Sequence, residues 1–196
     1  MDSAISTPGA WTPAQRPIPE HDPLGIGCKT GSMRVGNIRL DLKAHVNVTT
    51  EPQPMCLTDA DVVSDAVIRK GRWFDCGRFV RLWRGLVQPQ VGDTLIEVGA
   101  NIGSCTLEIL LRTNASIVAI EPNAINLYRL TRTLSLAAKR DPSLAHRVVV
   151  LPIGGGEHAS QEPLYAQRNN LGNSVRATWT HNKVTARAFA CMSTGT

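Results

Sequence analysis

The chain has 196 residues, of which 42% are hydrophobic, and it carries a formal net charge of +5 at pH 7. These values favour one globular domain with a hydrophobic core. The lysines and arginines are scattered rather than gathered into a run, so the charge does not indicate a nucleic-acid surface. No run approaches the roughly 18 apolar residues of a membrane span, and the amino terminus lacks the pattern of a signal peptide. We therefore expect a cytoplasmic protein without a membrane partner.

The five cysteines are expected to be reduced. They are odd in number, widely spaced and never in a C-x-x-C pattern, which favours reduced thiols over disulfides or a zinc site. They are Cys28, Cys56, Cys76, Cys105 and Cys191. Two tripeptides, beginning at Asn47 and Asn114, match the Asn-x-Ser/Thr glycosylation motif, which has meaning only in a secreted protein.

The first 57 residues are predicted to lie outside the main domain. Residues 1–30 contain five prolines and no hydrophobic periodicity, so they are predicted to be a disordered lead. Apolar residues alternate from Met33 to Val48 around Gly36-Asn37, which predicts a small β-hairpin within an extension spanning residues 31–57. The hairpin would either cap the main sheet or line a substrate entrance, and a purely structural role is favoured.

Two helices are predicted before the central motif. Thr58 and Asp61 resemble a capping box that opens a helix ending near Gly71. A second helix follows, with Trp73 and Trp83 on its apolar face and three arginines, at positions 78, 81 and 84, largely off that face. Arginines beside tryptophans would suit RNA stacking. The favoured interpretation is a helix that packs through its aromatic side chains, with the arginines reaching water.

The central motif begins with the short apolar run from Thr94 to Val98, which predicts a strand. Gly99 and Gly103 bracket the turn that follows, and Asn101 within it tolerates an unusual backbone angle. Apolar residues at helical spacing come next, and residues 116–120 form a second apolar run rich in β-branched residues. This βαβ unit predicts a parallel, buried sheet.

Two acids mark the carboxyl ends of these strands, where open α/β sheets bind their ligands. Glu121 follows the second strand and can accept hydrogen bonds from the hydroxyls of a ribose. The turn lacks the middle glycine of the G-x-G-x-x-G dinucleotide site. Glu97 would repel a pyrophosphate and attract the ammonium and sulfonium cations of S-adenosylmethionine, which favours this cofactor over NAD. The alternative is that Glu97 is a solvated strand end and the glycines only form a tight turn.

The polar faces of the two crossover helices are predicted to be exposed. On the first helix these residues are Glu108 and Arg112. On the second, which follows Glu121, they are Arg129, Arg132 and Lys139.

Residues 148–151 are predicted to form a third buried strand. The loop after it would lie at the same sheet edge as Glu121, and Glu157 would contact an adenine there, unless the segment is a plain flexible loop. Residues 164–166 and 173–177 are predicted to form a short pair of strands.

A family resemblance covers residues from about Asp59 to about Val175. The sequence EVGANIG at 97–103, IVAIEPN at 117–123 and the following Asn126 resemble the FkbM-type S-adenosylmethionine-dependent methyltransferases. That family shows an acid, then V-G-A-N-x-G, then a strand ending in E-P-N. The resemblance implies an α/β, Rossmann-like class I methyltransferase fold with a parallel sheet flanked by helices. It also implies S-adenosylmethionine as methyl donor and methylation of a hydroxyl oxygen on a small molecule or sugar.

The resemblance also implies which residues bind the cofactor. Those at the methionine end of the donor, or in the same turn, are Glu97, Gly99, Ala100, Asn101 and Gly103. The ribose would be held by Glu121, with Pro122 and Asn123 as neighbours of that contact. No catalytic base is identified. The candidates by residue type are His146, His158 and His181, although lone histidines in loops are usually solvated. No metal site is predicted.

The resemblance ends before the carboxyl terminus. Family members continue through further strands that complete the sheet, and residues 181–196 match none of them. We therefore expect a donor-binding domain over residues 58–180, an irregular tail over 181–196, and a sheet that is incomplete at the C-terminus. An incomplete sheet has an exposed edge, which predicts self-association. Three other functions remain open: an inactive fragment or nucleotide-binding module, a nucleic-acid methyltransferase or binder, and an NAD-linked enzyme.

Overall fold

The structure is a computed structural model, and seven segments of it are described. They are residues 27–34, 52–59, 61–86, 92–154, 163–167, 170–176 and 186–187. Several expectations lie outside these segments: the proline-rich lead up to residue 26, the hairpin around Gly36-Asn37, the roles of Glu157, His158 and His181, and most of the carboxyl-terminal tail.

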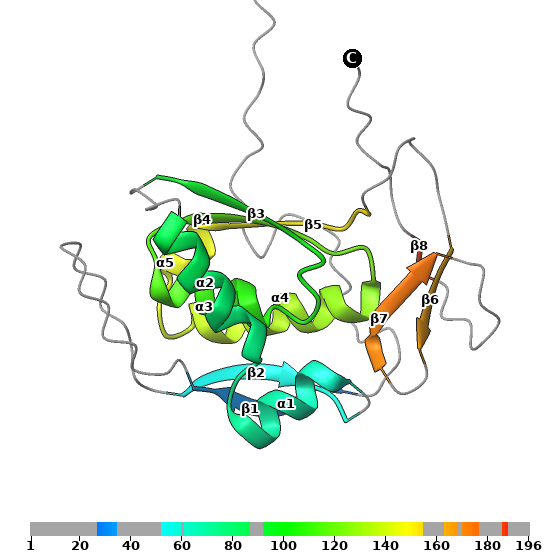
Figure 1. The fold of residues 1–196 in the computed structure, drawn as a ribbon. Coiled ribbons are helices and arrows are strands. Elements are labelled where there is room, and N and C mark those ends of the chain that lie inside the picture. Colours follow the sequence, from blue (N-terminus) through cyan, green and yellow to red (C-terminus); the bar gives the residue numbers. More distant parts are fainter. Residues whose placement is uncertain are drawn as a thin grey trace, which may run out of the picture.

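The described chain forms three sheets and five helices. In order these are β1 (Lys29–Met33), β2 (Gln53–Leu57), α1 (Val62–Lys70), α2 (Phe74–Leu86), β3 (Thr94–Val98), α3 (Ser104–Arg112), β4 (Ser116–Ile120), α4 (Ala124–Ala138), α5 (Ser143–His146), β5 (Val148–Leu151), β6 (Pro163–Gln167), β7 (Asn170–Arg176) and β8 (Ala186–Arg187). Helices α2 to α5 lie between the parallel sheet β3-β4-β5 and the antiparallel pair β1-β2 (Figure 1). The third sheet is antiparallel, in the order β7-β6-β8. Among the described residues, no helix is both long and apolar enough to cross a membrane.

The parallel sheet confirms the α/β class and the predicted βαβ unit. Its three strands pair in chain order, with Thr94 opposite Ser116 and Ile117 opposite Val148. Since crossovers between parallel strands have one hand, this order places both crossover helices on the same face (Figure 1). The parallel sheet therefore has one face covered by helices.

The opposite face of β3 is open to solvent. Ile96 is 64% exposed and Val98 is 71% exposed. Within the described segments, β3 pairs only with β4, so its second edge has no partner strand there. An uncovered apolar face beside an unpaired edge is the feature that favours association between chains.

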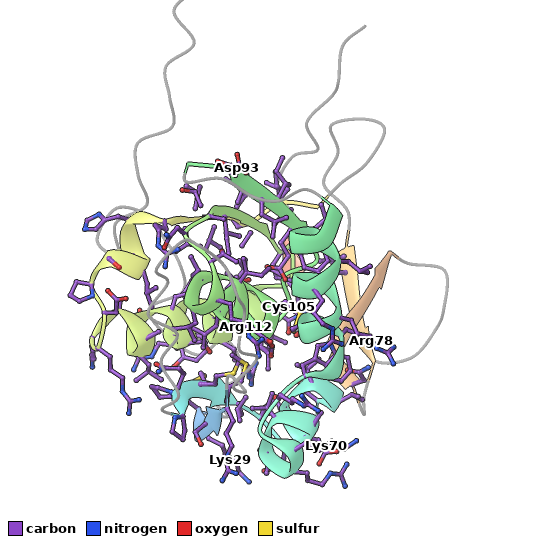
Figure 2. The ribbon with its side chains drawn as sticks, turned by 60° about the vertical axis from the view of Figure 1, so that its left-hand side comes forward. Lys29, Lys70, Arg78, Asp93, Cys105 and Arg112 are labelled. Atoms are coloured by element: carbon purple, nitrogen blue, oxygen red, sulfur yellow. A yellow bond between two sulfur atoms is a disulfide. The ribbon has the colours of Figure 1, made fainter. Side chains whose placement is uncertain are left out.

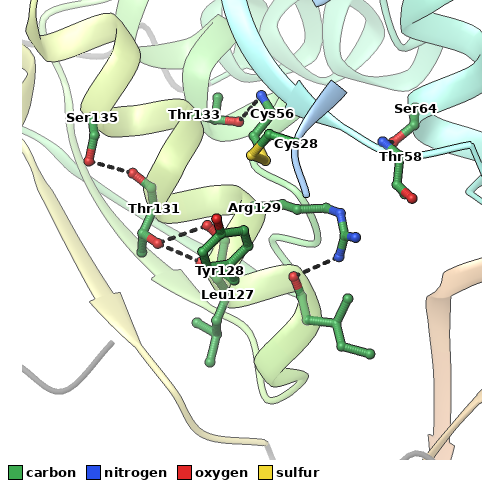
Figure 3. The surroundings of a disulfide bond; sticks show 11 residues. Cys28, Cys56, Thr58, Ser64, Leu127, Tyr128, Arg129, Thr131, Thr133 and Ser135 are labelled. Atoms are coloured by element: carbon green, nitrogen blue, oxygen red, sulfur yellow. Dashed lines mark hydrogen bonds between the residues drawn. A yellow bond between two sulfur atoms is a disulfide. The ribbon is translucent and has the colours of Figure 1, made fainter. Parts of the chain in front are cut away.

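Helix α4 is enclosed from two sides. Strand β2 packs against it, and the backbone N–H of Cys56 donates to Thr133 Oγ1 at 3.1 Å (Figure 3). Arg129, which the sequence placed outside, is only 1% exposed, and its guanidinium donates to the Ile125 carbonyl at 3.1 Å. The expectation for Arg129 was wrong because the β1-β2 layer covers the outer face of α4. Arg132 is exposed as expected.

Helix α3 is also more buried than its sequence indicates. Glu108 and Arg112, predicted to face outward, are both buried and form an ion pair of 2.9 Å. Helix α2 packs against α3, and Arg112 lies in the interior of the molecule (Figure 2). Burial raises the pKa of Glu108, and the positive charge of Arg112 opposes that rise. The predicted exposed face is thus a contact between two helices.

Helix α1 ends as predicted and starts three residues later than the capping box indicated. Gly71 ends the helix in a left-handed conformation, at φ 70°. The amino-terminal cap is Asp61, whose carboxylate accepts from the Ser64 backbone N–H at 2.7 Å. Thr58 instead donates its backbone N–H to Ser64 Oγ at 3.1 Å.

Four cysteines are paired in two disulfides, so the expectation of reduced thiols was wrong. Cys28–Cys56 joins the segment before β1 to β2 (Figure 3), and Cys76–Cys105 joins α2 to the first turn of α3. The partners are 28 and 29 residues apart in the sequence, and packing alone makes them neighbours. Closing loops of this length stabilises a fold by about 3 to 4 kcal/mol each in the chain-entropy model.

The open face of β3 leads to a prediction about self-association. We expect Val98→Glu to lower the weight-average mass in sedimentation velocity toward the 21.2 kDa of one chain, because a charge at this edge opposes edge-to-edge pairing. The matched control is Arg132→Gln, which changes the net charge by the same amount at an exposed site on α4. A wild-type chain that sediments as a monomer at all concentrations would contradict the prediction.

Candidate functional site

The turn after β3 holds three left-handed residues within five positions. Gly99 has φ 80°, Asn101 has φ 54° and Gly103 has φ 85°, which confirms the unusual backbone angle expected of Asn101. The backbone N–H groups of Gly99 and Ala100 both donate to the Ile120 carbonyl, at 2.9 and 3.0 Å. The turn is therefore folded back over the carboxyl end of β4.

The two glycines of this turn have different roles. A Cβ built on Gly99 would meet no atom within 4 Å, so the turn borders open space there. A Cβ on Gly103 would collide with Leu130 Cδ1 of α4. Gly103, proposed from the sequence as a cofactor contact, is buried and allows α3 to approach α4. Gly99 is the position where a ligand would reach the backbone.

Glu121 connects the turn after β3 to the start of α4. Its side chain is buried, and Oε2 accepts from the Asn101 backbone N–H at 2.8 Å. Oε1 accepts from the Asn123 backbone N–H at 2.9 Å and from the Asn126 amide at 3.4 Å. Burial raises the pKa of Glu121, and these three hydrogen bonds oppose the rise. A carboxylate has about four acceptor positions, so roughly one remains for a ligand.

Glu97 lies on the neighbouring strand, with its side chain toward α3. It is half-buried, and Thr106 Oγ1 donates to its Oε2 at 2.6 Å. Burial raises the pKa of Glu97 to about 7; the hydrogen bond from Thr106 opposes this rise, and the negative charge of Glu121 adds to it. At neutral pH the group is thus shared between its acid and its carboxylate form. Thr106 is a site residue that the sequence did not identify, because helical spacing marks it only as part of an apolar face.

The other residues predicted to bind the cofactor, Ala100, Pro122 and Asn123, contribute to the structure of the turns at the carboxyl edge of the parallel sheet. Asn123 is buried, and its Oδ1 accepts from the Ile125 N–H at 2.9 Å, which caps α4. Ala100 is buried in the turn. Pro122 is half-buried, and a Cβ on Gly154 would lie 3.7 Å from it. The segment after β5 therefore reaches the same edge, as the sequence predicted.

Of the three histidines considered as a base, His146 alone lies within the described segments. His146 is exposed and ends α5 just before β5, which places it at the amino edge of the sheet, opposite Glu97 and Glu121. In the described segments, no group of three or more acidic, histidine or cysteine side chains is arranged to hold a metal ion. A cavity of about 580 Å³ lies between β1 and α1, lined by residues that include Lys29 and Gly71, and not at this edge.

Comparisons with known proteins give one partial likeness. No protein-family model matches the chain, and no curated protein matches it. Among solved structures, a crystal structure of the methyltransferase FkbM from Methylobacillus flagellatus KT is 28% identical, over 40% of this chain and 21% of that protein, with a TM-score of 0.35. The matched part is thus about a fifth of the other protein. A likeness of this extent is local and establishes neither a shared fold nor a shared function.

The two glycines allow a paired test of the turn. We expect Gly103→Ala to destabilise the fold by roughly 2 to 4 kcal/mol, since it combines left-handed strain with overpacking against Leu130. Gly99→Ala should cost only about 1 to 2 kcal/mol, because its Cβ meets open space and only the strain remains. Urea unfolding of both variants measures the difference. Equal losses would contradict the distinct roles.

The raised pKa of Glu97 predicts a pH-dependent stability. Between the ordinary value of 4.5 and about 7, the folded state binds more protons than the unfolded state. The contribution of the protonated Glu97 carboxyl group to the free energy of unfolding is therefore fully present below pH 4.5 and is lost as the pH rises through about 7. Glu97→Gln removes this loss, so at pH 8 we expect the variant to be more stable by roughly 1 to 3 kcal/mol.

Thr106→Val is expected to raise the pKa of Glu97 further, and so serves as a second test of this carboxyl group. It removes the hydrogen bond that lowers the pKa of Glu97, so stability should go on falling to a higher pH than in the wild type. Urea unfolding from pH 4 to pH 9 measures both variants. A Glu97→Gln chain with the same pH profile as the wild type would show that the carboxyl group is not perturbed.

Proposed function

We propose that the carboxyl edge of the parallel sheet binds S-adenosylmethionine, and that the chain is a Rossmann-like class I methyltransferase domain acting on a hydroxyl of a small molecule or sugar. One observation carries the proposal. Two carboxylates with raised pKa values, Glu97 and Glu121, lie at the ends of neighbouring strands, beside the turn that is open at Gly99. A cation that also carries a ribose suits this arrangement.

The residues present fit the parts of this cofactor. The Glu97 carboxylate attracts the ammonium and sulfonium charges, and a cation beside it favours its ionised form. Glu121 has about one acceptor position left, enough for one hydrogen bond from a ribose hydroxyl. The open space at Gly99 lets a ligand lie against the backbone. When bound, S-adenosylmethionine supplies an activated methyl group.

The backbone of the turn disfavours a dinucleotide. A pyrophosphate site needs backbone N–H groups that point at the ligand. In this turn the N–H of Asn101 donates to Glu121, that of Ile102 to Asn101 Oδ1, and that of Gly103 to the Ala100 carbonyl. Those of Gly99 and Ala100 donate to the end of β4. All five groups are committed within the protein, which supports S-adenosylmethionine over NAD.

Transfer of a methyl group to a hydroxyl also needs alignment and a base. The described residues contribute donor-binding groups, and His146 lies at the opposite edge. This placement favours a second candidate function, in which the chain binds the cofactor without catalysing a reaction. The alternative function, binding or methylation of nucleic acid, has less support, because Trp73 is half-buried and does not form an exposed surface for base stacking.

Calorimetric titration of the full chain with S-adenosylmethionine tests the proposal. We expect binding in the micromolar range, and a loss of roughly 1 to 3 kcal/mol in Glu121→Gln, which weakens acceptance from the ribose and also removes one of the hydrogen bonds from the Asn101 and Asn123 backbone. Affinity should also rise about fivefold from pH 6 to pH 7, because the cation binds the ionised form of a group with a pKa of about 7. In Glu97→Gln this rise should disappear.

Arg132→Gln is the control, since it changes the charge on an exposed face of α4 away from the edge. Its affinity should equal that of the wild type. A wild-type chain that unfolds cooperatively and yet binds no S-adenosylmethionine at millimolar concentration would overturn the proposal. Binding without transfer to any hydroxyl acceptor would instead support the second candidate function.

A further inference from the structure

The turn between α3 and β4 presents one side chain to solvent between two buried neighbours. This turn contains the tripeptide Asn114-Ala115-Ser116. Asn114 is exposed, whereas Thr113 and Ala115 are buried. The motif thus occurs in the setting that a carbohydrate acceptor requires, a surface loop with its asparagine pointing outward.

Arg147 fixes the backbone on both sides of Asn114. Its guanidinium donates to the carbonyls of Thr113 at 2.7 Å, Ala115 at 3.2 Å and Leu110 at 2.6 Å. The Ser116 N–H donates to the Asp93 carbonyl at 2.9 Å. These contacts use the backbone around Asn114 and none of them uses its side chain. A bulky group on Asn114 would therefore leave the packing of the turn unchanged.

Asn114 is also remote from the candidate site. It precedes β4, so it lies at the amino edge of the sheet, whereas Glu121 follows the same strand at the carboxyl edge. The five residues of β4 span roughly 16 Å at about 3.3 Å per residue. A group attached at Asn114 would project away from the edge where Glu97 and Glu121 lie.

The disulfides indicate the compartment in which such a group is added. Cys28–Cys56 and Cys76–Cys105 pair four of the five cysteines. Structural disulfides form and persist in oxidising compartments and are rare in the cytosol. The cytoplasmic location expected from the sequence rested on the lack of a membrane span and of a signal-peptide pattern, whereas the two disulfides favour an oxidising compartment. The two disulfides therefore support a secretory compartment, where an Asn-x-Ser motif such as that at Asn114 can be glycosylated.

We propose that Asn114 is an acceptor site for an N-linked oligosaccharide, added in an oxidising secretory compartment. The donor is an oligosaccharide linked through a pyrophosphate to a lipid. Nδ2 of Asn114 forms a bond to the anomeric carbon of the first sugar, while the bond from that carbon to the pyrophosphate oxygen breaks. The lipid pyrophosphate leaves with the electron pair, and one amide proton passes to a base of the transferring enzyme.

The full chain, expressed behind a cleavable secretion signal in eukaryotic cells, tests this assignment. Peptides are mapped after release of N-glycans by a glycosidase in heavy-oxygen water, which labels each occupied asparagine as aspartate. We expect label at Asn114, and an electrophoretic shift that the glycosidase removes. The shift due to this site should be lost in Asn114→Gln and Ser116→Ala and kept in Ser116→Thr, which retains the hydroxyl that the motif requires.

Asn47→Gln removes the other glycosylation motif and leaves Asn114 intact, so any electrophoretic shift that remains in this variant is due to Asn114. Thiol alkylation before and after reduction reports the cysteines in the same sample. Because the label is read on the wild-type chain, the test does not depend on the folding of any variant. An unlabelled Asn114 in a secreted chain with both disulfides formed would overturn the proposal. Free thiols at all five cysteines in the secreted chain would also overturn it, since the compartment argument would fail.

Discussion

The carboxylate of Glu121 accepts hydrogen bonds from the backbone N–H of Asn123 in its own turn and from that of Asn101, which lies 20 residues earlier in the chain. Burying a carboxylate is costly, and hydrogen bonds to its oxygens offset that cost. Because one donor is the backbone of Asn101, the left-handed turn after β3 is fixed relative to the start of α4. Glu97 on the next strand is then fixed as well. The negative charges of the two carboxylates repel each other, and a cation bound beside them would reduce this repulsion.

The layers explain where the rest of the stability comes from. Both crossover helices cover one face of the parallel sheet, and the β1-β2 pair adds a third layer beyond α4. The core lies in this half of the molecule, while the opposite face of β3 contributes little. The two disulfides reinforce the outer parts of the covered half: one holds the β1-β2 layer together, and the other joins α2 to α3.

Much of the parallel sheet could be predicted because its signals are local. The strands at 94–98, 116–120 and 148–151 are apolar runs between turn residues, and all three are confirmed. The burial of Arg129 could not be predicted, because helical periodicity records the polarity of a side chain and not what another layer places over it. The disulfide partners are neighbours only after folding. For the site, the acids were predictable from their positions at strand ends, whereas the contact of Thr106 with Glu97 and the resulting pKa depend on burial.

The contacts of Arg147 can form only late during synthesis of the chain. Its guanidinium secures the turn at Thr113 from a position 34 residues later in the chain. At translation rates of about 5 to 20 residues per second, the turn remains without this contact for roughly 2 to 7 s after Thr113 is made. During that interval β4 lacks β5, although its other partner, β3, has already been made. An enzyme acting on the growing polypeptide would meet Asn114 before Arg147 binds the carbonyls of Thr113 and Ala115 on either side of it.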